Sequence, residues 1–318
     1  AIRAVERLAV EFVQEMLGVV DGQVSVEVDG RLAYKRRPTI DRARSLISQL
    51  EELGVDKKRV LLKIPATWEG IEAAAKLQQS DGIHCHMTLV FGRHQLAACA
   101  DSGAAVISPA VGRITDWHKK KDGVESYPAD EDPGVRAALA MHDYLIHHGY
   151  STLLMPGMFR SIEQAIALAG SERLSLPLKL LSLLEEQEGD VAAMLSRGVA
   201  LGPPGDRLTI DAPTFSSSLS ADELSASKLQ SGVRNLSWAV VSQEKQLVDW
   251  IEARQDEAAH TSTLALFRIW DYDGDGYIDR EEWGGTDEVF NALDRDSNGR
   301  ISLEEMAIGL GAPYRPEQ

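Results

Sequence analysis

The chain has few cysteines, a shortage of positive charge and no long apolar run. Its two cysteines, Cys85 and Cys99, form no CxxC pair, which argues against a disulfide framework and indicates a reducing compartment. With 33 basic against 49 acidic residues the formal net charge is −16, so we expect no nucleic-acid partner. No run reaches transmembrane length and no signal peptide opens the chain, so we expect no membrane partner and a cytoplasmic location.

The acidic residues are concentrated near the C-terminus. Residues 255–318 hold 15 acidic and 5 basic residues, whereas the first 254 hold 34 and 28. Hydrophobic residues make up 44% of the chain, enough for one domain of about 250 residues and a smaller one. We therefore predict a large domain over residues 1–255 and a small acidic domain over 256–318.

Short β-rich runs alternate with amphipathic helical stretches along the large domain. The predicted strands are residues 23–29, 60–66, 84–91, 104–111, 152–159 and 173–181. This alternation predicts a parallel sheet covered by helices, and its six βα units are two short of a (β/α)8 barrel. The chain begins AIRAVERLAVEFVQEM, at helical spacing with no Met or capping residue before it, so we expect missing upstream residues that hold the other two units.

Two acidic segments of the small domain share one spacing. Residues 271–282, DYDGDGYIDREE, and 294–305, DRDSNGRISLEE, place oxygen-bearing side chains at positions 1, 3, 5, 9 and 12 and glycine at position 6. This is the spacing of an EF-hand loop, in which position 7 adds its backbone carbonyl and a bidentate Glu closes the shell around Ca²⁺. The predicted ligands are Asp271, Asp273, Asp275, Tyr277, Asp279 and Glu282 in loop 1, and Asp294, Asp296, Asn298, Arg300, Ser302 and Glu305 in loop 2.

The small domain is therefore predicted to be an all-α EF-hand pair. The alternative is an acidic, glycine-rich linker, which two full matches in tandem make a poor interpretation. Loop 1 has carboxylates at Asp275 and Asp279 where loop 2 has Asn298 and Ser302, so we expect loop 1 to bind Ca²⁺ more tightly. Whether the pair opens as a sensor or stiffens the tail is left open.

One predicted strand contains an unexpected charge. Lys63 interrupts the apolar run VLLKIPA, and burial makes an ammonium group lose its proton more readily. A neutral amine attacks ketones to form a Schiff base, which serves as an electron sink. The alternative is a lysine that pairs with a carboxylate such as Glu27, which lies in the strand VSVEVD. Both residues together predict a polar site at the C-terminal ends of the strands.

The segments VLLKIPATWEGIEAA, GIHCHMTLVFGRHQLAACADSGAAVISPAVGRITDW and EDPGV resemble the class I transaldolases. The resemblance covers most of residues 1–255, and an EF-hand tail occurs in part of that family. It implies a (β/α)8 TIM-type barrel and an enzyme of the pentose phosphate pathway. Such an enzyme transfers a dihydroxyacetone unit from sedoheptulose 7-phosphate or fructose 6-phosphate to an aldose phosphate. It implies no metal or cofactor for the chemistry beyond the Schiff base.

The resemblance also implies roles for individual residues. Lys63 matches the Schiff-base lysine, and Glu27 and Thr88 match the pair that orients the catalytic water. The predicted substrate contacts are His86, Ser108, Arg113 and Arg160. The two arginines match phosphate contacts, because guanidinium forks fit phosphate oxygens; the alternative for them is surface salt bridging.

Three residues in this site depart from the family pattern. His86 stands where HCNMT has Asn, so we expect a group that titrates near neutrality. Ala110 stands where the family has Phe, which we expect to open the site, and Met158 replaces a small polar residue near the phosphate. The family's first two strands, with an Asp and an Asn of the site, match nothing in this sequence.

Three hypotheses follow. The chain is a transaldolase whose N-terminal portion is absent, which we expect to impair this polypeptide; or it is a degenerate, non-catalytic relative that binds calcium or sugar phosphates; or it is a Schiff-base aldolase that cleaves without transferring. Product analysis with and without an acceptor aldehyde separates the third from the first. The oligomeric state stays open, a homodimer included.

Overall fold

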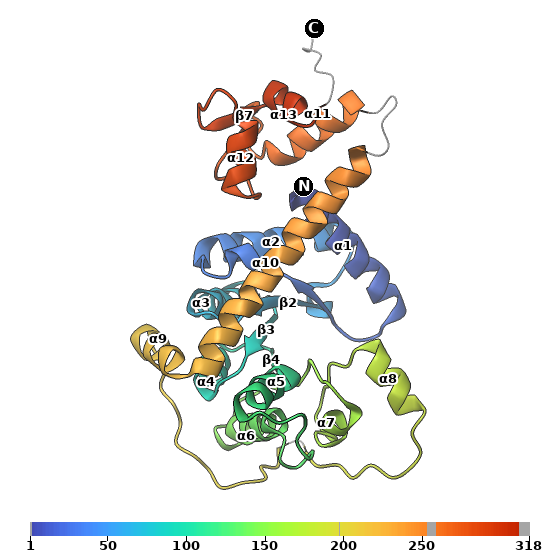
Figure 1. The fold of residues 1–318 in the computed structure, drawn as a ribbon, viewed down its shortest axis with the longest axis vertical. Helices are drawn as coiled ribbons and strands as arrows, with labels where there is room; N and C mark the ends of the chain where they lie inside the picture. Colours follow the sequence, from blue (N-terminus) through green and yellow to red (C-terminus); the bar gives the residue numbers. More distant parts are fainter. Residues whose placement is uncertain (1, 197, 253–258, 312–318) are drawn as a thin grey trace. The chain divides into compact units, whose positions relative to one another are not determined.

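A computed structural model describes residues 2–196, 198–252 and 259–311 (Figure 1). It divides into two compact units, one of residues 13–236 and the other of residues 1–12 together with 237–318. The boundary that we predicted between residues 255 and 256 lies outside the described residues, so it stays a prediction.

The larger unit is built on a parallel sheet. Its strands are β1 (Val24–Glu27), β2 (Val60–Pro65), β3 (Cys85–Val90), β4 (Val106–Pro109) and β5 (Leu153–Leu154). They pair in the order β1-β2-β3-β4-β5, each parallel to the next, which confirms the predicted α/β class with a parallel sheet.

Helices connect and flank these strands (Figure 1). They are α1 (Ile2–Val19), α2 (Arg36–Glu52), α3 (Trp68–Lys76), α4 (Arg93–Asp101), α5 (Val111–Asp122), α6 (Pro133–His147), α7 (Ile162–Ile166), α8 (Leu178–Glu185), α9 (Ala212–Ala221) and α10 (Glu223–Glu252). In the part of the chain that is described, no helix is both long and apolar enough to cross a membrane.

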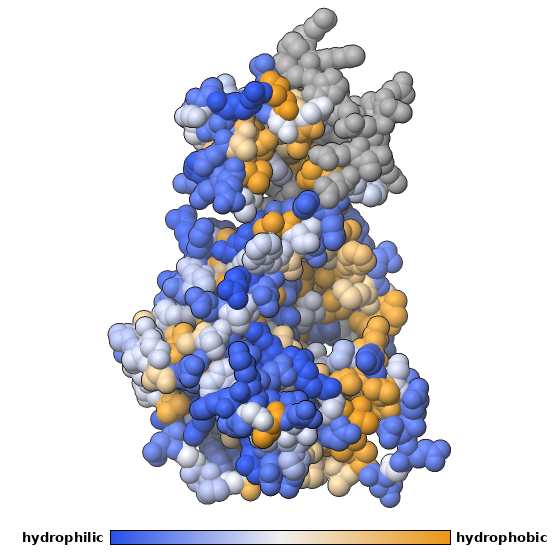
Figure 2. All heavy atoms as spheres, in the orientation of Figure 1, coloured by the Kyte–Doolittle hydropathy of each residue, from blue (hydrophilic) through white to orange (hydrophobic). Residues whose placement is uncertain are grey.

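The sixth predicted strand, residues 173–181, is wrong. Ser175 makes only an isolated parallel bridge to Gly157, and α8 starts directly after Pro177. A short apolar run does not distinguish a strand from a helix by its period, and proline before the run favours a helix start. The helix leaves Leu178 82% exposed, and hydrophobic side chains gather on the surface around α8 (Figure 2).

The core of the sheet explains why β2 can hold a lysine. Every residue of β2 is buried except Lys63. Leu62 and Ile64 are fully buried and point to the face of the sheet opposite Lys63, because side chains alternate along a strand. The apolar face fixes the register of β2 and leaves the other face free for polar groups.

The EF-hand module has its own apolar core. Its elements are α11 (Ala259–Trp270), β6 (Tyr277–Asp279), α12 (Asp287–Leu293), β7 (Arg300–Ser302) and α13 (Leu303–Gly309). Strands β6 and β7 pair antiparallel, with Ile278 opposite Ile301, and both isoleucines are fully buried in the core with Phe290. The expected all-α module therefore includes a short sheet, because position 8 of each loop extends to meet the other.

Candidate functional site

The parallel register brings polar residues from four strands onto one face of the sheet. Glu27 lies opposite Lys63, and Lys63 lies opposite His86. Thr88 is two residues beyond His86 on β3, and Ser108 is two residues beyond the β4 residue that lies opposite His86. Side chains two residues apart share a face, so the sequence-predicted residues of β1 to β4 come together in one polar site.

Lys63 and Glu27 form the ion pair at the centre of this face. Lys63 Nζ lies 3.6 Å from Glu27 Oε2, and the two side chains are 27% and 33% exposed. Burial raises the pKa of Glu27, and the positive charge of Lys63 partly offsets that rise. The ion pair that the sequence offered as the alternative for Lys63 is therefore present. It also puts a carboxyl group with a raised pKa beside the amine.

His86 is held between two serine hydroxyls. Its Nδ1 lies 3.0 Å from Ser25 Oγ on β1, and its Nε2 lies 2.8 Å from Ser108 Oγ on β4. Burial lowers its pKa from 6.5 to about 3, with smaller contributions from the charges of Lys63 and Arg173. The expectation that His86 titrates near neutrality is wrong, because a buried site beside two cations excludes the charged imidazolium. A neutral imidazole has one donor and one acceptor nitrogen, so it orders both hydroxyls.

The two predicted phosphate arginines have different partners. Arg113 on α5 donates from Nη2 to the Lys228 carbonyl oxygen at 3.1 Å and to Ser231 Oγ at 3.1 Å, both on α10. Arg160, after β5, pairs with Asp116, with Nη2 2.7 Å from Oδ2. For Arg160 the structure therefore contains the salt bridge that was the alternative to phosphate binding.

These cations also affect one another. Burial lowers the pKa of Arg113, and the neighbouring Arg160 lowers it further. The pKa of Lys228 is lowered by burial and then by Arg113. Positive groups lower one another's pKa when they are close, so these groups form a positive cluster, near which Asp116 supplies negative charge. Such a cluster suits an anion such as phosphate.

The other two departures from the family pattern lie near this cluster. Ala110 is buried in an apolar cluster that includes Leu89 and Leu229, and the predicted opening of the site at Ala110 stays a prediction. Met158 has a left-handed backbone, with φ of 59°, which is uncommon for a residue with a side chain. Its carbonyl oxygen accepts a hydrogen bond from Arg160 Nη1 at 3.2 Å, so its backbone helps to hold the arginine.

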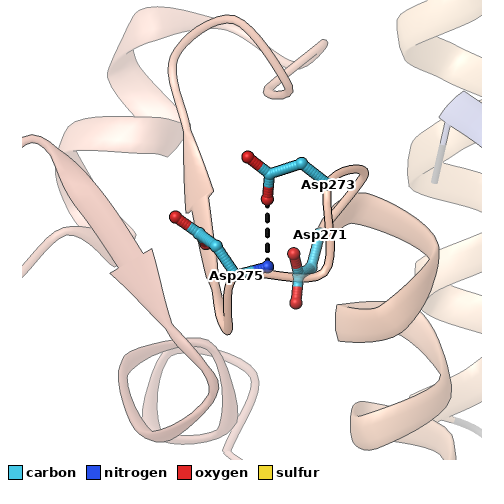
Figure 3. A group of neighbouring side chains, drawn as sticks. All are labelled: Asp271, Asp273 and Asp275. Atoms are coloured by element: carbon cyan, nitrogen blue, oxygen red, sulfur yellow. Dashed lines mark hydrogen bonds between the residues drawn. The ribbon is translucent and has the colours of Figure 1, made fainter.

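The EF-hand loops have the donor sets that a calcium ion needs. In loop 1, Asp271, Asp273 and Asp275 each offer a carboxylate oxygen within 4.8 Å of the others (Figure 3). Asp271 Oδ1 is buried without a hydrogen-bond partner, which is costly unless a cation is supplied. Glu282 Oε2 accepts from the Asp279 backbone N–H at 2.9 Å, so the residue at position 12 closes back over loop 1.

Loop 2 repeats the arrangement. Asp294, Asp296 and Glu305 offer oxygens within 4.8 Å of one another. The glycines at position 6 of the two loops, Gly276 and Gly299, have φ of 87° and 84°, which explains why this position requires glycine. Hard carboxylate oxygens converging at this spacing fit Ca²⁺ in both loops.

Comparisons with known proteins identify the family. The transaldolase/fructose-6-phosphate aldolase family model matches residues 1–247, and an EF-hand model matches residues 264–284 and 286–308. The chain belongs to the transaldolase/fructose-6-phosphate aldolase family. Membership implies a TIM-type α/β barrel, which agrees with the parallel strands β1 to β5.

Relatives with curated names support the same assignment. A transaldolase from Thermosynechococcus vestitus is 44% identical over 309 residues, which are 97% of this chain and 79% of the relative. A transaldolase from Synechocystis sp. is 43% identical over 316 residues, or 98% of this chain and 79% of the relative. A transaldolase from Methylococcus capsulatus is 43% identical over 249 residues, or 78% and 75%.

Four residues around the family's site were not predicted from the sequence. The spacing along β1 could have placed Ser25 in the site, because it lies two residues before Glu27 and so shares the same face of the strand. Arg173 is the first residue of the run 173–181, which we had assigned to a strand. Lys228 and Ser231 lie 115 and 118 residues from Arg113 along the chain, so no local pattern connects them with it.

Proposed function

We propose that the chain is a transaldolase. It transfers a dihydroxyacetone unit from a ketose phosphate, sedoheptulose 7-phosphate or fructose 6-phosphate, to an aldose phosphate, as a step of the pentose phosphate pathway. The observation that carries the proposal is the amine of Lys63 beside Glu27 on the one polar face of a buried strand. The relatives named transaldolase, at 40–44% identity, support it.

In the proposed mechanism the Lys63 amine attacks the ketose carbonyl. Glu27, with a water that Thr88 helps to orient, gives and takes the protons as the carbinolamine loses water to form the iminium. Glu27 then takes the proton of the C4 hydroxyl, the C3–C4 bond breaks and its electron pair enters the iminium, giving an enamine and a free aldose phosphate. The enamine carbon attacks the acceptor aldehyde, whose oxygen takes the proton back from Glu27. Water then hydrolyses the new iminium, which releases the product ketose phosphate and restores the Lys63 amine. The raised pKa of Glu27 suits a carboxyl group that must accept and return a proton.

The remaining predicted residues hold the sugar phosphate. Ser108, with its hydroxyl ordered by neutral His86, hydrogen-bonds the sugar chain. Arg113 and Arg160 bind the phosphate, for which Arg160 gives up part of its pairing with Asp116. Lys228 adds a third positive charge close to Arg113.

The rest of the architecture follows as part of this proposal. The described strands, with the bridge at Ser175, form six of the eight positions of the family's barrel. The barrel domain takes residues 1–255 and the EF-hand pair residues 256–318.

Both loops bind Ca²⁺ through the predicted ligands, with Tyr277 and Arg300 contributing backbone carbonyls. Free, buried Cys85 and Cys99 support a reducing, cytoplasmic location. The expectations on nucleic acid, membranes and a homodimer stay predictions.

The first test is borohydride trapping of the Schiff base. The full chain is incubated with fructose 6-phosphate, reduced and mapped by mass spectrometry, after circular dichroism has established that it is folded. We expect an adduct on Lys63 that is absent from Lys63→Arg. Exposed Lys76→Arg serves as the matched control and keeps the adduct. A folded chain without an adduct contradicts the proposal and favours the non-catalytic relative.

The family name includes an aldolase, so one alternative activity needs its own measurement. A cleaving enzyme releases free dihydroxyacetone from fructose 6-phosphate with no acceptor present. A transaldolase forms product in quantity when erythrose 4-phosphate is added. Free dihydroxyacetone at the same rate with and without the acceptor would identify the aldolase.

A further inference from the structure

The short sheet of the EF-hand module brings a residue of loop 2 into loop 1. Asp279 of β6 lies opposite Arg300 of β7. Asp279 is position 9 of loop 1, and Arg300 is position 7 of loop 2. In an EF-hand, position 7 binds the ion through its backbone carbonyl, so its side chain can contact other residues.

The side chain of Arg300 reaches the carboxylates of loop 1. Its Nη1 lies 3.3 Å from Asp275 Oδ2, and its guanidinium lies over the Tyr277 ring, 5.7 Å from the ring centre. The other oxygen, Asp275 Oδ1, accepts from the Tyr277 backbone N–H at 2.9 Å. Asp275 also belongs to the group of three carboxylates that fits calcium. The guanidinium therefore pairs with a carboxylate that belongs to the proposed calcium shell.

We propose that Arg300 is a built-in counter-cation of loop 1, which pairs with Asp275 in the absence of Ca²⁺ and must release it when the ion binds. Arginine stays protonated at any physiological pH, so its charge is permanent. It neutralises one carboxylate and repels the incoming divalent ion, and both effects lower the calcium affinity of loop 1. This inference rests on the proposed calcium binding and is independent of the transaldolase activity.

The arrangement is one-sided. Loop 1 has the uncharged Tyr277 at position 7, so it offers loop 2 no corresponding cation. The single arginine of loop 1, Arg280, pairs with Asp287 on α12, with Nη1 2.8 Å from Oδ1. Loop 1 has more carboxylates than loop 2, which favours tighter calcium binding by loop 1. Arg300 therefore acts against this difference in affinity. Its backbone is part of loop 2, so the release of Asp275 also links the two loops.

The test compares two variants of the full chain that each lose one arginine. Arg300→Gln keeps the backbone carbonyl and removes the charge that faces loop 1. Arg295→Gln removes an exposed charge at position 2 of loop 2 and is the matched control. Calcium titration by calorimetry, in a Glu305→Gln background that disables loop 2, isolates the affinity of loop 1. We expect Arg300→Gln to tighten binding about 3- to 10-fold and Arg295→Gln to change it less than about 2-fold.

Two further variants make the outcome specific. Arg300→Lys keeps the positive charge and keeps affinity near that of the native chain. In an Asp275→Asn background, the gain from Arg300→Gln becomes smaller, because the pairing is already lost and only the repulsion of the ion remains. Unchanged or weaker binding in a folded Arg300→Gln chain, or an equal gain in Arg295→Gln, overturns the inference. A native chain that takes up no calcium at all overturns the proposed calcium binding, and this inference with it.

Discussion

At the scale of single residues, surroundings decide chemical state. His86 is only 3% exposed, and each of its ring nitrogens is hydrogen-bonded to a serine hydroxyl. An imidazole in water is half protonated near pH 6.5, whereas this one stays neutral until about pH 3. His86 therefore acts as a fixed, uncharged hydrogen-bonding group between β1 and β4.

The pH dependence of the free energy of unfolding should show that His86 stays neutral in the folded chain. Because the pKa of His86 is lowered in the folded state from 6.5 to about 3, the unfolded chain binds the extra proton in that range. The contribution of neutral His86 to the free energy of unfolding is complete above pH 6.5. Below that pH it falls by about 1.4 kcal/mol per pH unit. Urea unfolding of the native chain and of His86→Asn at pH 7, 6 and 5 measures it, and the variant should have the flatter profile.

A matched variant controls for the loss of a histidine as such. His118 on α5 is half-buried, and the profile of His118→Asn measures what the loss of a histidine as such does to the slope between pH 5 and 7. Parallel profiles for the native chain and His86→Asn would show that the folded state accepts the proton on His86.

At the scale of elements, one buried carboxylate joins three helices. Asp132 caps α6, and its Oδ1 accepts from the Gly134 N–H at 2.8 Å and from Thr115 Oγ1 of α5 at 2.7 Å. Its Oδ2 accepts from Gln164 Nε2 of α7 at 2.8 Å. The side chain is 4% exposed, so these partners replace water almost entirely. Helix α5, which carries Arg113, and helix α7, which follows Arg160, are thereby fixed to one another.

Removing this carboxylate should destabilise the larger unit strongly. We expect Asp132→Ala to lower the free energy of unfolding by about 3 kcal/mol, because it removes a helix cap and leaves buried donors unpaired. The comparison is Asp211→Ala, which removes the exposed cap of α9 and its bond to the Thr214 N–H. Urea unfolding should give a smaller loss for Asp211→Ala; equal losses would contradict the role of Asp132 as a junction.

At the scale of the whole molecule, the chain has two compact units with separate apolar cores. The sheet unit buries Leu62, Ile64 and Ile107, and the EF-hand module buries Ile278 and Phe290. Cores that share no residues favour separate unfolding transitions.

Calcium should therefore stabilise one transition and leave the other in place. At about 100 times the dissociation constant, a ligand that binds only the folded state adds about 2.7 kcal/mol. Calorimetry with calcium and with a chelator should show the EF-hand transition moving and the sheet transition fixed. Glu282→Gln together with Glu305→Gln should abolish the shift. A calcium shift of both transitions in the native chain would mean that the units unfold together.

The sequence by itself determined the groups whose chemistry depends on local spacing. The calcium loops follow from alternate oxygens and a glycine with positive φ, and the polar face of β1 and β2 follows from Glu27 and Lys63 inside apolar runs. Family-specific segments around these residues were enough to identify the family. Five of the six predicted strands formed, because their apolar faces are continuous.

Only the tertiary structure decided what depends on burial and on distant neighbours. The charge of His86 depends on its enclosure between β1 and β4, and the surroundings of Arg113 depend on α10, more than a hundred residues away. The contact of Arg300 with Asp275 depends on the pairing of β6 with β7. Spacing along the chain carries information about residues within a few positions, whereas desolvation and long-range charge arise only when the elements pack.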